Sequence, residues 1–152
     1  MSEVSKLARL HNIAVLGLLE TKVKDDNIDF VKNKMLPHWD YLLNKNTNST
    51  SRIWVTWNPE NAKVTLIEDN HQFLHVNILD VHKNQNIQAT FVYGLYTPKD
   101  RKELWDNLSK FANTNQGIPW LTLGDFNEVL QPQEIFGGNQ KRDPGMEDFN
   151  NC

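Results

Sequence analysis

The hydrophobic residues of this chain fall into short runs that polar clusters separate. Residues 13–19 are almost continuously apolar, a pattern typical of a strand that is covered on both faces. The apolar run that begins at Ile118 has the same character, and it stops at Gly124, where polar residues follow at once. We therefore expect these two runs to be buried strands of a layered α/β protein.

The middle of the chain has the pattern of a β-sheet. Four segments with strand character follow one another, and short clusters of turn-forming residues separate them. Because such short connections favour antiparallel neighbours, we predict successive hairpins here. The predicted strands are residues 52–57, 62–67, 72–79 and 87–93, with a further short strand over residues 39–43.

Two helices are predicted before the β-rich region. Residues 3–11 have the periodicity of a short amphipathic helix. A second helix is expected to begin with Asp25 or Asp26 as its cap and to end at Pro37. The polar residues 44–51, which follow the short strand, are expected to form a mobile loop.

Two more helices are predicted in the second half of the chain. The first is expected to begin with Thr97 as its cap and Pro98 at its first helical position, and its apolar stripe is expected to lie in the core. Residues 143–145 have turn character, and another helix should begin at Met146. The stripe of the first helix consists of Leu104, Trp105, Leu108 and Phe111.

Composition limits the classes of protein to consider. The 152 residues suffice for one domain with a hydrophobic core, so we expect a single domain over residues 1–152, and both ends look cut. The formal charge of −3 gives no support to wide non-specific phosphate binding. The single cysteine, Cys152, excludes a disulfide framework, and no apolar run approaches the roughly 20 residues of a membrane helix. We expect a soluble intracellular protein, nuclear or cytoplasmic, without a membrane partner.

Polar residues stand at the ends of three predicted strands. Glu20 follows the first apolar run, Tyr93 ends the last hairpin strand, and Asp125 and Asn127 follow Gly124. In extended backbone the Asp125 and Asn127 side chains point to the same side. A carboxylate beside an amide could take a proton and hold an oxyanion or a phosphate oxygen. The same residues also fit a capped turn, and Glu20 also fits the surface boundary of a strand.

The histidines of the β-rich region are weaker candidates for a site. His71, His75 and His82 lack the spacing of metal ligands with a carboxylate nearby. His75 alternates with Phe73, so its side chain is expected on the face opposite to that of Leu74. We expect these histidines to face solvent or to be satisfied within the core.

Short motifs in family order carry a resemblance to a known superfamily. The ordered set spans nearly the whole chain and resembles the endonuclease/exonuclease/phosphatase superfamily, which includes the apurinic endonucleases and DNase I-like enzymes. The match is closest to the endonuclease domain of plant non-LTR retrotransposons of the long interspersed (LINE) type. The motifs are Leu-Leu-Glu-Thr-Lys at 18–22, Arg-Ile-Trp-Val-Thr-Trp at 52–57, Phe-Val-Tyr-Gly at 91–94, Arg-Lys-Glu-Leu-Trp at 101–105, Gly-Asp-Phe-Asn-Glu at 124–128, and Glu134 with Gly137 and Gly138.

The resemblance implies a fold, an activity and roles for particular residues. The fold is a DNase I-like α/β sandwich of two packed β-sheets with flanking helices, here truncated at both ends. The activity is Mg²⁺-dependent hydrolysis of phosphodiester bonds in DNA. Glu20 resembles the carboxylate that binds Mg²⁺, an ion that prefers few carboxylates and several waters. Lys22 would lie near the phosphate, Asp125 resembles the residue that activates the attacking water, and Asn127 would position that carboxylate or hold a phosphate oxygen.

The sequence also departs from the family pattern. Tyr93 resembles the tyrosine that contacts the phosphate, and Tyr96 is the alternative because the spacing up to Pro98 departs from the usual pattern. The Asn-centred motif that begins family members and the Ser-Asp-His motif that ends them are not found in these 152 residues. Because losing one member of a coupled catalytic set costs several orders of magnitude, we expect weak or absent activity.

Two alternatives to the nicking endonuclease stay open. One is a catalytically inactive retroelement-derived remnant or binding module, and the other is a phosphatase of the same superfamily. In every case the strand ends should converge, so Glu20, Tyr93 and Asp125 are expected on one rim of the sandwich.

Overall fold

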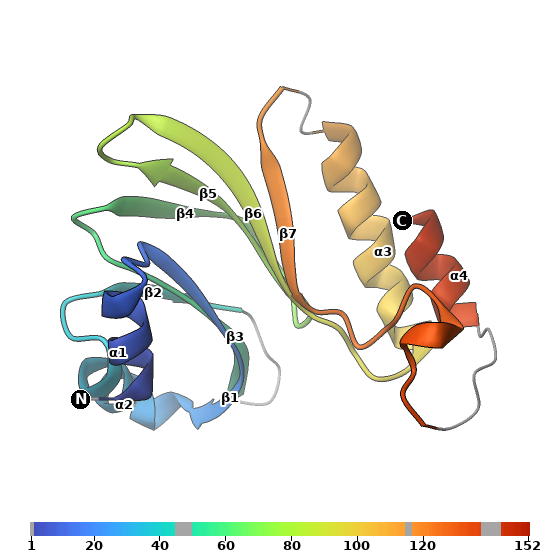
Figure 1. Ribbon diagram of the computed structural model, residues 1–152, viewed down its shortest axis with the longest axis horizontal. Helices are drawn as coiled ribbons and strands as arrows, with labels where there is room; N and C mark the ends of the chain where they lie inside the picture. The colour runs from blue at the N-terminus through green and yellow to red at the C-terminus, as the bar shows by residue number, and fades with distance from the viewer. Residues whose placement is uncertain (1, 45–49, 115–116, 138–143) are drawn as a thin grey trace.

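Two β-sheets pack against each other in the computed structural model, which describes residues 2–44, 50–114, 117–137 and 144–152 (Figure 1). The first sheet has three strands in the order β1-β3-β2, and the second has four in the order β4-β5-β6-β7. This arrangement confirms the predicted α/β sandwich. The strands are β1 (Val15–Lys24), β2 (Asp40–Leu43), β3 (Thr50–Trp57), β4 (Ala62–Asp69), β5 (Phe73–Asp80), β6 (Gln85–Tyr93) and β7 (Trp120–Asp125).

Helices flank both sheets. The first pair, α1 and α2, lies beside the three-stranded sheet, whereas α3 and α4 lie on the outer side of the four-stranded sheet (Figure 1). No helix in the described part of the chain is both long and apolar enough to cross a membrane. The helices are α1 (Glu3–Leu10), α2 (Ile28–Met35), α3 (Pro98–Thr114) and α4 (Pro144–Asn151), and two short 3-10 turns are η1 (Asp25–Asn27) and η2 (Pro132–Glu134).

Alternation along β5 divides the core into two layers. Leu74 and Val76 point between the sheets, where they pack with residues of β3 and β6. Phe73 points the other way and packs against the apolar stripe of α3, so the predicted role of that stripe is confirmed. His75 shares this face as expected: its Nδ1 lies 2.8 Å from the hydroxyl of Thr90, and the buried ring stacks on a phenylalanine of α3.

The connection from β3 to β4 corrects one predicted hairpin. The neighbours β4–β5 and β5–β6 are antiparallel as expected, but β3 and β4 belong to different sheets. β3 already lies between β1 and β2, so neither of its edges can accept another strand. The Asn58 carbonyl accepts hydrogen bonds from the backbone N–H groups of Asn61 and Ala62, both at 3.0 Å, and this turn carries the chain into the second sheet.

The first strand differs from its prediction in length and burial. β1 continues beyond residue 19 to Lys24, and Val15 to Leu19 are only partly buried, because β1 lies at the edge of its sheet. An open apolar cleft of about 730 Å³ lies between β1 and the strands β6 and β7. Leu121 of β7 lines this cleft and is 52% exposed.

Two helix starts also differ from the sequence prediction. Asp25 and Asp26 lie in η1, and α2 begins after Asn27, with no side-chain cap from either aspartate. The predicted turn at residues 143–145 is wrong for Pro144 and Gly145, which are the first two residues of α4. Proline favours the first turn of a helix, where its missing N–H costs nothing.

The predicted mobile loop falls mostly outside the described residues, since residues 45–49 are not among them. At its two ends, Asn44 and Ser51 are buried rather than solvent-exposed. Asn44 directly follows β2, and its side-chain oxygen accepts the backbone N–H groups of Arg52 and Ile53, so this end of the connection is fixed to β3.

Candidate functional site

A β-bulge places Glu20 and Lys22 beside the sheet. Leu19 pairs with Ile53 and Val23 pairs with Ser51, so three residues of β1 lie opposite one residue of β3. Glu20 and Lys22 adopt φ angles of 56° and 50°, which are uncommon for residues with a side chain. Such bulges redirect side chains out of the regular ladder and are frequent beside active sites.

The carboxylate of Glu20 is charged and accessible. Its oxygen lies 2.8 Å from the ammonium of Lys22, and the two side chains are 43% and 69% exposed. Hydrogen bonds from Lys22 and then from Tyr93 lower the pKa of Glu20, and the hydrogen bond with Glu20 raises the pKa of Lys22. Both groups are therefore ionised at neutral pH, and solvent or a ligand can reach them.

The ends of β6 and β7 bring Tyr93 beside Asp125. The two strands are parallel, and these residues are partners in the register. Gly124 has a φ of 143°, and a Cβ atom there would overlap the carbonyl oxygen of Val92. Glycine therefore allows the two backbones to approach closely at this end of the sheet.

Two tyrosine hydroxyl groups meet at the same place. The hydroxyl oxygens of Tyr93 and Tyr96 are 2.9 Å apart, and Tyr93 is buried whereas Tyr96 is 65% exposed. Burial first, and then hydrogen bonds with Tyr96 and Glu20, raise the pKa of Tyr93 far above its usual range. Tyr93 thus remains protonated and can donate a hydrogen bond at any physiological pH.

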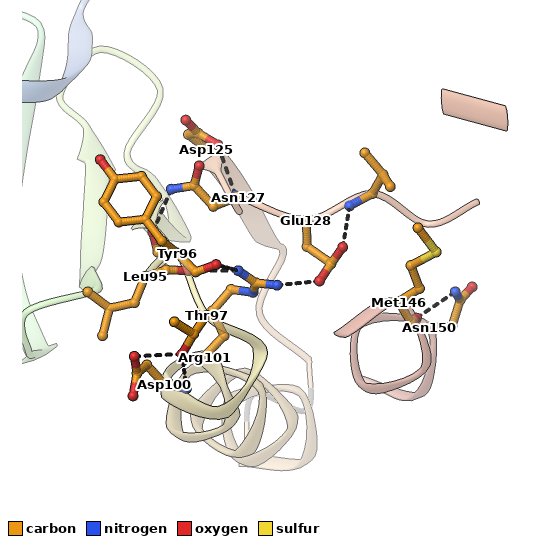
Figure 2. A network of polar contacts seen from close by, with 12 residues as sticks. Leu95, Tyr96, Thr97, Asp100, Arg101, Asp125, Asn127, Glu128, Met146 and Asn150 are labelled. Atoms are coloured by element: carbon orange, nitrogen blue, oxygen red, sulfur yellow. Dashed lines mark hydrogen bonds and ion pairs between the residues drawn. The ribbon is translucent and has the colours of Figure 1, made fainter. Parts of the chain in front are cut away.

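Asp125 and Asn127 form a turn at the end of β7, beside the end of β6. The backbone N–H of Asn127 donates to Oδ1 of Asp125 at 2.9 Å, and the Asn127 amide donates to the carbonyl of Gly94 at 2.6 Å (Figure 2). The two interpretations of these residues are therefore compatible, because the turn itself orients the carboxylate. Among the described residues, this backbone N–H is the sole hydrogen-bond partner of the Asp125 side chain.

A buried ion pair supports the loops that follow β6 and β7. Arg101 of α3 forms an ion pair with Glu128, and the two side chains are only 3% and 6% exposed. The same guanidinium donates to the carbonyl oxygens of Leu95 and Tyr96, at 2.8 and 3.0 Å, as Figure 2 shows. A Cβ atom at Gly145 would overlap the Glu128 carboxylate, so α4 also packs against this pair.

The structure thus brings most of the predicted site residues together. Glu20 is paired with Lys22 at 2.8 Å, the Tyr93 hydroxyl helps to lower the pKa of Glu20, and Tyr93 is the register partner of Asp125 at the ends of β6 and β7. Glu134 lies apart from this group: its carboxylate accepts the backbone N–H groups of Leu130 and Gln131, so it caps η2. Gly138 falls outside the described residues.

Two charged residues of the region were missed as individual candidates. Arg52 lies opposite the bulge of β1, and Arg101 forms the buried ion pair with Glu128. In the sequence both residues stood within family motifs, but neither was assigned a role. Neither could be found from local pattern, because a bulge and a buried ion pair depend on contacts between distant segments.

Comparison with solved structures places the fold. The structure superimposes on the endonuclease domain of TRAS1, a telomere-specific non-LTR retrotransposon, with a TM-score of 0.70 and 11% identity over 98% of this chain and 62% of that one. The chain has the fold of the endonuclease/exonuclease/phosphatase proteins. A protein of that family from Bacteroides thetaiotaomicron gives a TM-score of 0.64 at 10% identity, over 96% of this chain and 57% of that one.

A phosphatase shares the fold as well. ANGEL2, a 2′,3′-cyclic phosphatase, superimposes with a TM-score of 0.57 and 16% identity, over 83% of this chain and 43% of that one. This chain therefore corresponds to less than two thirds of each of these structures. No family model matches the sequence, and no curated protein matches it.

Proposed function

We propose that this chain carries the site of a Mg²⁺-dependent phosphodiester hydrolase that nicks DNA. The observation that carries the proposal is the convergence of Glu20, Tyr93 and Asp125: Glu20 comes from the bulge within β1, and the other two come from the ends of β6 and β7. The fold shared with a retrotransposon endonuclease supports the same reaction class and makes DNA the substrate to test first.

The donor set at the bulge fits a magnesium ion. Mg²⁺ keeps several waters and is usually bound through one or two carboxylates. Glu20 offers one exposed carboxylate for such an ion. Among the described residues, no group of three or more histidine, cysteine or acidic side chains could hold a metal ion. Glu20 is the residue that would hold the ion, which would supply charge stabilisation at the phosphate.

The remaining residues have separate tasks in the proposed reaction. Asp125 accepts a proton from water, whose oxygen attacks phosphorus as the bond from phosphorus to the leaving oxygen breaks. Asn127 orients Asp125 through its backbone N–H and through its anchor on Gly94. Lys22 and the exposed hydroxyl of Tyr96, which Tyr93 holds in place, face the phosphate oxygens.

A second candidate is hydrolysis of a phosphomonoester or cyclic phosphate at the same site. The fold shared with ANGEL2 favours it, because that protein is a 2′,3′-cyclic phosphatase. The same residues would serve, since water attacks phosphorus in each reaction, although a phosphomonoester carries more negative charge than a phosphodiester. Phosphate release from a panel of nucleotides and sugar phosphates distinguishes the two reactions.

The test is nicking of supercoiled plasmid by the purified chain, with Mg²⁺ or with EDTA, beside the Asp125→Ala variant. We expect weak Mg²⁺-dependent nicking that falls by about a hundredfold or more in the variant, the usual contribution of a general base. Asp106→Ala, which removes an exposed carboxylate of α3, is the matched control and should nick normally. Nicking that survives Asp125→Ala refutes the assigned role, and a folded chain without any nicking or phosphate release favours the binding module.

A further inference from the structure

Arg52 lies directly across from the bulge. It is the single residue of β3 between Ser51 and Ile53, which pair with the two ends of the bulged segment of β1. Glu20 and Lys22 are therefore its neighbours in the sheet, although the chain between them is long. The register alone places a third charged group at this end of the first sheet.

A buried amide fixes the backbone at Arg52. The side-chain oxygen of Asn44 accepts the backbone N–H groups of Arg52 and Ile53, at 3.1 and 2.9 Å. The amide nitrogen of Asn44 donates to the carbonyl of Asn70 at 3.0 Å, and the residue is only 2% exposed. A satisfied buried amide of this kind restricts where the strand can lie, so the Arg52 side chain leaves from a defined point.

The guanidinium of Arg52 lies over the ring of Tyr93. Its central carbon is 5.6 Å from the ring centroid, and the residue is partly buried.

The N–H donors of Arg52 are available, unlike those of Arg101. Arg101 uses its two terminal nitrogens on Glu128 and on two backbone carbonyls, and only its buried Nε–H has no partner in the described part of the chain. Among the described residues, by contrast, the guanidinium of Arg52 has no ion pair within 4 Å and no hydrogen-bond acceptor, and it lies over the face of Tyr93. A partly buried guanidinium held over an aromatic ring is suited to bind a planar or tetrahedral anion through paired N–H groups.

The balance of charges around the bulge also supports a role for the Arg52 guanidinium. Glu20 and Asp125 are both carboxylates, and Lys22 is already paired with Glu20. Without Arg52, and before any Mg²⁺ binds, these three side chains would carry a net charge of −1, which would repel a phosphate. We propose that Arg52 binds the non-bridging oxygens of a substrate phosphodiester and is a substrate-binding residue that the strand register, rather than the motif, places at the site. This inference rests on the proposed function and assigns it a further residue.

The test separates DNA binding from cleavage. A short fluorescein-labelled DNA duplex is titrated with the chain in EDTA, and its anisotropy is followed over a series of salt concentrations. We expect Arg52→Gln to bind about tenfold more weakly, in line with the loss of one charge-assisted contact. The slope of log K against log salt should fall by about 0.9, the value for one phosphate contact. Arg52→Lys, which keeps the charge but loses the paired donors, should bind with intermediate affinity.

Lys63→Gln is the matched control, because it removes the same charge from the other end of the second sheet. Lys63 pairs with Leu79, and Leu79 pairs with Asn86, which precedes Tyr93 by roughly 20 Å of extended strand. The control should change affinity by less than about twofold and leave the salt slope unaltered. Urea unfolding of all three variants checks that each remains folded.

The outcomes distinguish this inference from the proposed function. If Arg52→Gln binds as Lys63→Gln does, or if the unmodified chain does not bind the duplex at low salt, the inference is overturned. Nicking in the plasmid assay together with unchanged binding by Arg52→Gln overturns the inference and leaves the proposed function standing. Weakened binding by Arg52→Gln in a chain that never nicks supports the inference and removes the catalytic proposal.

Discussion

Arg52 and Arg101 occupy opposite environments in the same small protein. Arg101 is 3% exposed, lies under the loops that follow β6 and β7, and is paired with a carboxylate that is equally buried. Arg52 lies at the bulge, where its neighbours Glu20 and Lys22 are 43% and 69% exposed. One region therefore has its charges neutralised within the protein, and the other presents them at the surface.

The difference indicates which charges hold the fold and which can act on a ligand. Removing one partner of a buried ion pair strongly destabilises the folded protein, because the other charge is left without solvent or a counter-ion. An exposed pair such as Glu20 with Lys22 contributes little to stability, and each partner can exchange the other for an ion or a phosphate. The following predictions test this contrast, from the largest expected effect on stability to the smallest.

Breaking the buried pair should have the largest effect. We expect Arg101→Met to lower the free energy of unfolding by about 3–5 kcal/mol, because Glu128 is left buried and unpaired. Urea unfolding followed by circular dichroism measures it. The double variant Arg101→Met/Glu128→Gln should recover part of the loss, and a cost below about 1 kcal/mol for the single variant would contradict the assigned structural role.

Adding a methyl group at Gly145 should come next. A Cβ atom there would overlap the Glu128 carboxylate, so we expect Gly145→Ala to cost about 1–3 kcal/mol despite the higher helix propensity of alanine. In a Glu128→Ala background the same substitution should cost less, since the obstructing carboxylate is gone. Equal costs in the two backgrounds would show that α4 does not pack on the ion pair.

The buried His75 of the second sheet should make the free energy of unfolding depend on pH. Burial lowers the pKa of His75, so the unfolded chain takes up this proton at a higher pH than the folded chain does. His75 should thus contribute stability above its unfolded pKa and lose that contribution as pH falls through its folded pKa. Urea unfolding between neutral and mildly acidic pH should show a flatter dependence for His75→Gln, and an unchanged dependence would contradict the burial.

Substitution at the rim should have the smallest effect on stability. We expect Glu20→Gln to leave the urea midpoint at neutral pH unchanged within error, whereas Mg²⁺-dependent nicking should be lost. Because the pKa of Glu20 is lowered in the folded chain, any stabilisation it contributes is present at neutral pH and disappears as pH falls through that folded value. Destabilisation as large as that of Arg101→Met would erase the distinction between the two regions.

The local pattern of the sequence was sufficient to predict most helices and strands and the strand end that carries Asp125. Strand-like segments between clusters of turn-forming residues identified β5 and β6, and the stripe Leu104, Trp105, Leu108 and Phe111 identified the buried face of α3. Gly124 and Asp125 also marked a strand end correctly, because glycine and a capping side chain act within a few residues. Ordered short motifs indicated the fold although identity with the TRAS1 domain is only 11%.

The tertiary structure alone decided which charges meet. The bulge opposite Arg52, the passage of the chain from β3 into the other sheet, and the burial of Arg101 with Glu128 all depend on pairing between distant segments. A shift of one residue in strand register reverses every side chain of the strand, and local periodicity does not specify which residue of the partner strand lies opposite. The helices and strands of this protein can therefore be predicted from its local sequence. The distinction between Arg101, which supports the fold, and Arg52, the proposed phosphate-binding residue, arises only when the sheets assemble.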